Sequence, residues 1–401
     1  MPIRRIGATW VFPVTSPPFK NGVVEVDEQG TILSVGSLPS QKFEKASTEF
    51  YNGFLVPGFV NTHTHLEFSW CRKMISMHSG LPRFLARMAT LPVLPEEEIA
   101  SAIDKTILEM YREGVSAAGN ILTTEAGIPK KNNLPLRLYH FIELLDLPAS
   151  RVNVWEKGME IFYRFTNYPS GFPEFSSVSV TPHAPYTVSV KLFSLIASFA
   201  AEKGFPLSIH NQETASENEF FRSGKGDLAN TLKKLHVRTE EGFLGKTGSL
   251  QAFLPLLTEV TRVLLVHNTF TNAQDIDFAL SLHKQLFWVL CPNANLYIEN
   301  SLPPVDLLRK KNCTICIGTD SPASNNRISM LDELKTLSVF FPEISLQELL
   351  TWACYNGARA LGMESLLGSF EPGKKPGIVL MENSDHRNLR ITHQTKTRRL
   401  V

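Results

Sequence analysis

The 401-residue chain has almost no net charge, since 40 Lys and Arg residues against 39 Asp and Glu residues give +1 at pH 7. Basic and acidic side chains are interspersed, and no polybasic patch occurs. Proteins that bind nucleic acid or membrane surfaces usually carry such a patch. The sequence therefore argues against both kinds of partner and favours a small-molecule substrate.

Long apolar runs are also missing. No segment reaches the roughly 18 apolar residues that a membrane helix needs. Arg4 and Arg5 precede a short apolar stretch, as in a signal peptide. Three prolines interrupt that stretch, and no small-residue cleavage pattern follows. We therefore predict a cytoplasmic protein without a membrane segment.

Cysteine is scarce, with five residues scattered along the chain. An odd, scattered set in a long chain suits a reducing compartment and predicts no disulfide framework. Cys313 and Cys316 have C-x-x-C spacing, but no second pair completes a zinc site. We interpret both as ordinary strand residues.

One stretch carries the first chemical signal. The apolar run from Leu55 is interrupted by Pro57 and Gly58 and continues to His63 and His65. This pattern predicts a buried strand, and alternation along a strand points both imidazoles the same way. Two imidazoles on one side are half of a metal site, so the remaining ligands must come from elsewhere in the chain.

The central part of the chain alternates β-type runs with helical stretches. With the run that ends at His65 we predict eight strands, the others at 115–122, 138–144, 178–183, 205–210, 262–267, 286–290 and 314–319. Three glutamates after Pro95 favour the start of a helix there. Eight strand–helix units are typical of a (β/α)8 TIM barrel.

The two chain ends differ from this central part. Residues 19–36 alternate apolar and polar side chains around a turn at 27–30, which predicts a hairpin. Near the other end, a strand-like run at 378–381 follows a segment rich in proline and glycine. We predict that residues 1–55 and 370–401 join in one small β domain beside a barrel of residues 56–369.

Several predicted strands end in a histidine or an aspartate. These residues are His183, His210, His267 and Asp320, and Glu213 lies three residues after His210. Any one of them alone is more often structural. The carboxyl ends of barrel strands meet at one rim, so their joint placement predicts an active site there.

These features resemble the amidohydrolase superfamily, in particular its mononuclear-metal deaminase and chlorohydrolase branch. The resemblance extends over nearly the whole chain and rests on motifs at 57–65, 183–186, 210–214, 267, 291–295, 318–321, 356–362 and 371–373. It implies an α/β fold in which a (β/α)8 TIM barrel carries a small β-sandwich built from both chain ends.

By that resemblance one divalent metal, zinc or alternatively iron, is held by His63, His65, His210 and Asp320. Binuclear members bridge their metals with a modified lysine at the end of the fourth strand, and residues 178–181 contain no lysine. This favours one metal. Histidine and carboxylate ligation with one position left for water is also what a catalytic zinc site requires.

The resemblance also implies catalytic roles. Glu213 would shuttle a proton from the metal-bound water to a ring nitrogen, and Asp320 would help to remove that proton. His267 would position the hydroxide, and His183 would contact the substrate. The alternative for both histidines is a buried structural role.

Specificity is expected from the segment after the first strand. Arg83 and Arg87 are candidates to bind a carboxylate, ribose or phosphate-like group, and Trp70 could stack on a ring. Glu143 could accept a hydrogen bond from an amine or hydroxyl. The alternatives are a solvated helix face for the arginines and ordinary packing for the tryptophan.

The implied reaction is hydrolytic deamination of an aminated purine or nucleoside-type ring, with release of ammonia. The sequence at 66–69 favours aminodeoxyfutalosine among the substrates of similar proteins. Two alternatives remain open. One is hydrolysis of another C–N or C–Cl bond, as in a cyclic amide or a chlorohydrolase, and the other is a non-catalytic metal-binding barrel. A homodimer is expected for a barrel of this kind.

Overall fold

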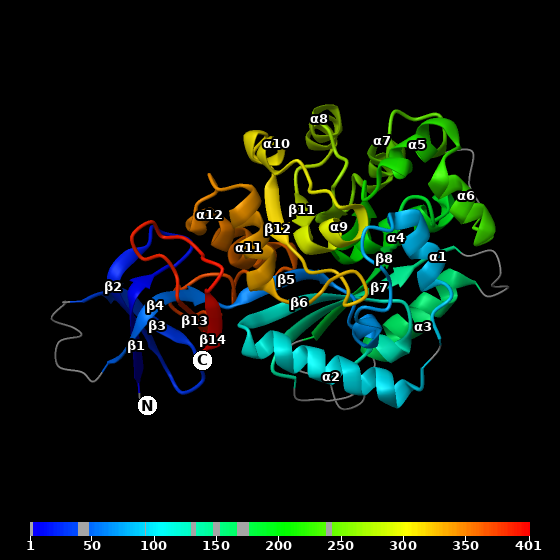
Figure 1. Cartoon of the computed structure of the whole chain (residues 1–401). Helices are drawn as coiled ribbons and strands as arrows, with labels where there is room; N and C mark the ends of the chain where they lie inside the picture. Colours follow the sequence, from blue (N-terminus) through cyan, green and yellow to red (C-terminus); the bar gives the residue numbers. More distant parts are fainter. Residues whose placement is uncertain are drawn as a thin grey trace.

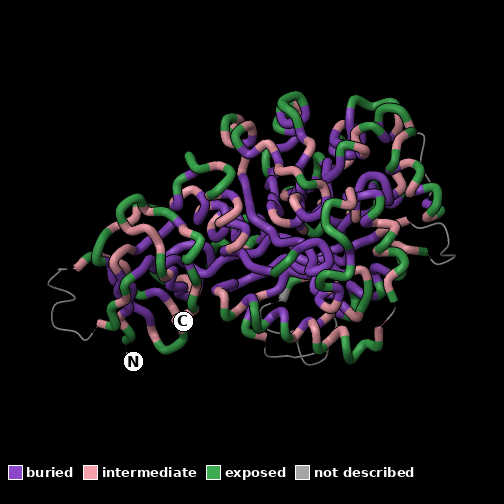
Figure 2. The backbone as a smooth tube through the Cα atoms, viewed as in Figure 1, coloured by how far each residue is buried: buried purple, intermediate pink, exposed green. Residues whose placement is uncertain are grey.

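The computed structural model describes residues 3–38, 48–92, 94–129, 134–146, 153–166, 176–237 and 243–401. A small sheet that contains both chain ends lies beside a larger body of parallel strands and helices (Figure 1). The strands of the larger body are buried, and exposed residues concentrate on the outer helices and loops (Figure 2). In the described ranges no helix is long and apolar enough to span a membrane, and all five cysteines are free.

The small sheet contains strands from both ends of the chain. Its strand order is β14-β13-β4-β1-β2-β3. The strands are β1 (Arg4–Val11), β2 (Phe19–Val26), β3 (Ile32–Ser37), β4 (Glu49–Pro57), β13 (Ile378–Glu382) and β14 (Lys396–Arg399). The antiparallel pair β2 and β3 is the predicted hairpin, and β13 pairs with β4. These six strands form one sheet, so a sandwich of two sheets stays a prediction.

The eight predicted strands of the central part are all observed, with small shifts at their ends. They form two parallel sheets of four strands, in the orders β5-β6-β7-β8 and β12-β11-β10-β9. Their bounds are β5 (Phe59–Thr64), β6 (Val115–Leu122), β7 (Arg137–Leu144), β8 (Ser176–Pro182), β9 (Leu207–Asn211), β10 (Val263–His267), β11 (Leu286–Leu290) and β12 (Thr314–Ile317). Strands β5, β6, β9, β10 and β11 are buried at every residue, which is typical of parallel strands covered on both faces.

Helices follow and surround these strands. They are α1 (Leu81–Met88), α2 (Glu96–Arg112), α3 (Val154–Thr166), α4 (Val190–Lys203), α5 (Ala215–Ser223), α6 (Asp227–Lys234), α7 (Ser249–Phe253), α8 (Ala273–Leu282), α9 (Pro292–Glu299), α10 (Val305–Lys310), α11 (Met330–Phe340), α12 (Leu346–Leu350) and α13 (Gly357–Ala360). A 3-10 turn at Leu66–Cys71 follows β5. The predicted start after Pro95 is confirmed, because α2 begins at Glu96 with three glutamates in its first turn.

The two parallel sheets approach each other at both outer edges, β8 beside β9 and β12 beside β5. Backbone hydrogen bonds link the strand ends across these edges. The amide of His210 donates to the carbonyl of His183 at 3.0 Å, and the amide of Thr319 donates to the carbonyl of His63 at 3.0 Å. The carboxyl ends of all eight strands therefore point to one region, where the predicted site residues lie.

Arg399 on β14 connects the small sheet to the start of β6. Its guanidinium donates to the carbonyls of Tyr111 and Val115 at 3.1 and 2.8 Å and to the hydroxyl of Ser116 at 2.8 Å. Burial lowers the pKa of Arg399, so this cation depends on those acceptors.

Replacing Arg399 with alanine is expected to lower the free energy of unfolding by about 2 kcal/mol or more, because acceptors on the buried residues Val115 and Ser116 lose their donor. Arg398→Ala is the matched control, because Arg398 is exposed and pairs with Glu382 at 3.3 Å. We expect it to lower the free energy of unfolding by less than about 1 kcal/mol. Urea unfolding of both variants measures the difference. Equal losses would show that the buried contacts of Arg399 add nothing.

Candidate active site

Two imidazoles leave the end of β5 side by side. His63 is the fifth residue of this strand, and His65 is the first residue after the strand ends. The two are two positions apart, so alternation turns both side chains toward the strand ends of the other sheet. Their ring centroids are 4.9 Å apart. Both ring nitrogens of His63 and Nδ1 of His65 are buried and lack a hydrogen-bond partner among the described residues. Leaving buried nitrogens unpaired is costly, so these rings are suited to bind a metal ion.

Asp320 brings a carboxylate to the same two rings from the loop after β12. Its Oδ1 lies 3.5 Å from Nε2 of His65 and 3.7 Å from Nε2 of His63. The hydroxyl of Ser324 donates to the other carboxylate oxygen and so fixes the orientation of the group. The backbone of Asp320 is left-handed, with φ of 56°, which turns its side chain back over the end of β5.

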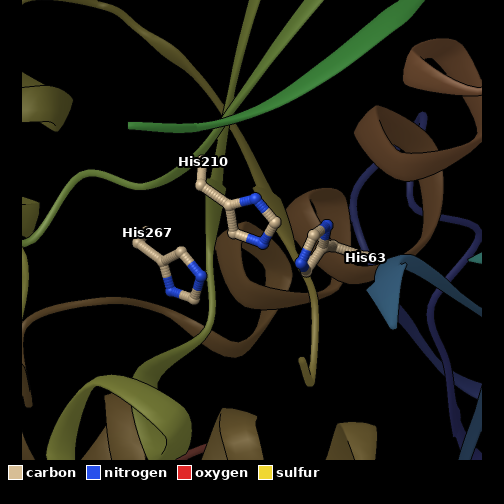
Figure 3. A group of neighbouring side chains, drawn as sticks. All are labelled: His63, His210 and His267. Atoms are coloured by element: carbon tan, nitrogen blue, oxygen red, sulfur yellow. The ribbon is translucent and has the colours of Figure 1, made fainter. Parts of the chain in front are cut away.

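His210 completes the cluster from the end of β9. Its Nδ1 donates to the carbonyl of His183 at 2.8 Å, which leaves Nε2 free to bind a metal, as is usual for metal-ligating histidines. Figure 3 shows the rings of His63, His210 and His267 turned toward one another. The ring centroids of His63 and His210 are 5.0 Å apart.

The side-chain donors of this cluster fit a divalent metal. One ligand atom from each of His63, His65 and Asp320 lies within 4.8 Å of the others, and the same holds for His63, His210 and His267. Several nitrogens and one carboxylate in a buried site are the ligand types that zinc and iron take. The structure thus brings together the four residues predicted as ligands: His63, His65, His210 and Asp320.

Glu213 lies beside this cluster, in the turn after β9. Its Oε1 is 3.6 Å from Nε2 of His267. Burial raises the pKa of Glu213 well above its ordinary value, and the negative charges of Asp320 and Glu217 raise it further. A carboxyl group with a raised pKa at this place is suited to take up and release a proton during a reaction.

A second carboxyl group holds the backbone that carries Glu213. The fully buried side chain of Glu217 accepts from the backbone amides of Gln212 and Glu213 at 2.9 and 3.2 Å, and the hydroxyl of Ser249 also donates to it. Burial raises the pKa of Glu217 to about 7. Gln212 has a left-handed backbone with φ of 47°, so the clamp stabilises an unfavourable turn.

We expect Glu217→Ala to lower kcat about ten- to a hundredfold with little change in KM, because it frees the turn that aims Glu213, whereas Glu217 itself does not line the cavity. Glu219→Gln is the matched control, since Glu219 is exposed on the same helix. Steady-state kinetics and thermal unfolding of the Glu217→Ala, Glu217→Gln and Glu219→Gln variants measure this. A lower melting temperature of Glu217→Ala with an unchanged kcat would contradict a positioning role. So would a Glu217→Gln variant that fails to fold, because Glu217 would then be needed for stability rather than for positioning.

His267 is oriented by a residue of α9. Its Nδ1 lies 2.8 Å from Oδ1 of Asn295, so Nδ1 carries the proton and donates, because an amide oxygen only accepts. Nε2 is buried, lacks a hydrogen-bond partner among the described residues and faces Glu213. The fixed tautomer leaves Nε2 free to accept a hydrogen bond or to bind a metal. The motif at 291–295 was recognised in the sequence, but no role was predicted for Asn295.

A cavity of about 170 Å³ opens beside these groups. The polar residues that line it are His65, His183, His210, Glu213, His267, Asp320, Ser321, Thr123 and Glu143. The apolar and aromatic residues that line it are Phe68, Leu81, Phe84, Leu85, Met88, Leu145 and Tyr186. Four of these apolar residues come from the single helix α1, so the site suits a molecule with a polar, reacting end and an apolar part.

Comparison with known proteins agrees with this geometry. The model of the amidohydrolase family matches residues 54–398, which is most of the chain. The chain belongs to the amidohydrolase family.

The alignments with individual relatives extend over nearly the whole chain. A 5-methylthioadenosine/S-adenosylhomocysteine deaminase from Saccharophagus degradans is 27% identical over 95% of this chain and 83% of its own. The solved Helicobacter pylori aminofutalosine deaminase in complex with methylthio-coformycin has a TM-score of 0.79 and 23% identity, and the match covers 97% of this chain and 93% of that one. An adenosine deaminase from Xanthomonas campestris, solved with bound zinc, has a TM-score of 0.74 and 22% identity over 97% of this chain and 87% of that one.

The residues predicted to contact substrate fall into two groups in this amidohydrolase. His183 and Glu143 line the cavity. The Nδ1 of His183 lies 2.7 Å from the hydroxyl of Thr187, and Oε1 of Glu143 lies 3.5 Å from Nδ1 of His210. Burial raises the pKa of Glu143 well above its ordinary value, and the charge of Glu67 adds to this.

Arg83, Arg87 and Trp70 do not line this cavity. Both arginines are exposed, and Arg83 lines a separate hollow. The side chain of Trp70 packs against the hydrophobic core. The apolar residues of α1 line the cavity instead. Their spacing at 81, 84, 85 and 88 is the i, i+3, i+4, i+7 signal of one helix face, and this signal could have shown from the sequence which side of α1 faces inward.

Proposed function

We propose that this amidohydrolase is a metal-dependent hydrolytic deaminase that acts on an aminated purine or nucleoside-type ring and releases ammonia. The observation that carries the proposal is the position of Glu213. Its protonatable carboxyl group lies in the same cavity as the histidine–aspartate cluster and faces His267. Deamination needs such a group, because a ring nitrogen must gain a proton while water adds to the neighbouring carbon. The activities named for its relatives support the same reaction.

The metal in this proposal is zinc. His63, His65, His210 and Asp320 would hold it, which fits their unpaired nitrogens and nearby carboxylate. A solved member of similar fold binds zinc. When bound, such an ion lowers the pKa of a coordinated water toward about 7 and supplies a nucleophile at neutral pH.

The residues of the chain divide the proton transfers between them. Glu213 takes a proton from the attacking water and gives one to the ring nitrogen, a role that fits its position in the lining of the cavity. Nε2 of His267 accepts a hydrogen bond from the same water, since Asn295 holds the proton on Nδ1. His183 and Glu143 line the cavity where the ring would bind, and Asp320 adds negative charge that favours loss of the water's proton.

We further infer that the two parallel sheets form one (β/α)8 barrel. Their outer strands lie side by side at both edges, and backbone hydrogen bonds cross between His210 and His183 and between Thr319 and His63. A barrel places functional groups at the carboxyl ends of its strands, and the candidate ligands occupy these ends.

Ammonia release tests the proposed function. Zinc-loaded protein is incubated with adenosine, 5′-methylthioadenosine, guanine, aminodeoxyfutalosine and, as a C–Cl substrate, a chlorotriazine. We expect ammonia from at least one purine compound and no chloride from the triazine. Release of chloride alone would favour the chlorohydrolase alternative. No product from any compound, with metal bound, would contradict the proposed deaminase function.

A further inference from the structure

The cavity has one wall that the proposed chemistry does not use. This wall, here called the α1 wall, consists of Leu81, Phe84, Leu85 and Met88. It lines the same cavity as residues of the histidine–aspartate cluster. Among the described residues that line the cavity, none is Lys or Arg. A substrate that places its reacting ring at the cluster therefore extends its remaining part along apolar side chains.

The α1 wall is held in place by contacts behind it. The side chain of Glu299 accepts from the amide of Leu81 at 2.6 Å, and the amide of Gly80 donates to the carbonyl of Ile298 at 3.0 Å. Helix α1 also packs against α6 and α9. Because these contacts join α1 to the neighbouring helices α6 and α9, the apolar face of α1 lines the cavity before any substrate binds.

The described residues that line the cavity include no Lys or Arg. Arg83 and Arg87 are exposed, and Arg83 lines a separate hollow together with Asn230 and Lys234. A carboxylate on the substrate tail would lose its water against the α1 wall without a cationic partner there. This loss disfavours its binding.

We propose that the α1 wall is a subsite for an uncharged, apolar substituent of the nucleoside, and that it selects against substituents that carry a carboxylate. This inference rests on the proposed deaminase function and narrows its substrate class. It favours relatives of alkylthio-adenosines over nucleosides with an acidic tail, including aminodeoxyfutalosine.

A matched pair of compounds tests the subsite. In 5′-butylthio-5′-deoxyadenosine the tail ends in a methyl group, and in 5′-(3-carboxypropylthio)-5′-deoxyadenosine a carboxylate replaces that methyl group. We expect kcat/KM for ammonia release to be at least about tenfold higher with the butylthio compound, since an unpaired buried charge is costly. An equal or higher value for the carboxylate compound would overturn the inference.

A charge placed in the wall provides the second test. Met88 is partly exposed, so Met88→Lys can bury its methylene groups in the wall and hold its ammonium group near the tail. This variant is expected to shift the butyl-to-carboxylate ratio of kcat/KM at least about tenfold toward the carboxylate compound. Ala89→Lys adds the same charge one residue further on, at an exposed position, and should leave the ratio unchanged. Equal shifts in both variants, or none in Met88→Lys, would contradict the subsite.

Binding without turnover separates this inference from the proposed function. Calorimetry with the Glu213→Gln variant measures the affinity of both compounds directly. If neither compound releases ammonia from the unchanged protein, yet the butylthio compound binds at least about tenfold more tightly, the deaminase proposal fails and the subsite stands. If ammonia is released but the two affinities are equal, the deaminase stands and the subsite fails.

Discussion

Glu213→Gln is expected to reduce kcat for ammonia release by at least about a hundredfold while the protein keeps its fold and its metal. The glutamine side chain has nearly the same shape as the glutamic acid it replaces, but it cannot take up or release a proton in the relevant pH range. General acid–base groups typically contribute factors of about a hundred to ten thousand. Glu213 is not among the four candidate ligands, so metal binding should be unaffected.

Three measurements on the purified Glu213→Gln variant check this result: ammonia release, zinc content by mass spectrometry and thermal unfolding. Glu219→Gln is the control, because it makes the same chemical change on an exposed residue nearby and should retain full activity. Turnover near the original rate in Glu213→Gln would remove Glu213 from the proton transfer. Loss of zinc together with activity would assign it a role in metal binding instead.

The features that the sequence predicted best are those set by local rules. Each buried parallel strand is a short apolar run, and alternation along β5 places His63 and His65 on one side without any knowledge of the rest of the fold. The same holds for the strand ends at His210 and His267. Because parallel strands share one direction, residues at their carboxyl ends lie close together. This rule predicted that the candidate ligands form one cluster.

The glycine at position 318 reflects a close approach of neighbouring chain segments. A Cβ atom on Gly318 would lie 2.9 Å from Cβ of His63 and 3.0 Å from Sγ of Cys291. Only glycine therefore fits between β5 and β11 just before Asp320. This contact explains why glycine precedes the Thr319-Asp320 pair, and it helps to fix the distance between the carboxylate and the two histidines.

Other parts of the site could not be predicted, because they depend on contacts between distant segments. Asn295 reaches His267 from another strand–helix unit, and nothing in its local sequence names that partner. Glu217 lies one helical turn from Glu213, where a second acidic residue is more often solvated; only its burial shows that it clamps the backbone. For α1 the spacing of apolar residues was informative, but the choice of Arg83 and Arg87 followed their chemistry rather than the helix face.

Removing the carboxylate of Asp320 is expected to abolish most metal binding and, with it, activity. Asp320 lies against both His63 and His65, with Oδ1 at 3.7 and 3.5 Å from their Nε2 atoms. Without it, a divalent cation would be held by neutral imidazoles alone. Loss of a ligand should weaken zinc binding at least as much as loss of an outer-shell partner does, which is about ten- to a hundredfold.

Zinc content and zinc-dependent thermal stability measure this effect independently of any substrate. A ligand that binds only the folded state raises the melting temperature, and a tighter ligand raises it more, so the unchanged protein should be stabilised by added zinc and Asp320→Ala much less. Asp306→Ala is the control, because Asp306 is an exposed aspartate at the start of α10 that pairs with Arg309. Should Asp320→Ala bind zinc as tightly as the Asp306→Ala control, the carboxylate is not a ligand, and the metal must be held by the histidines, including His267, whose Nε2 also has no partner among the described residues.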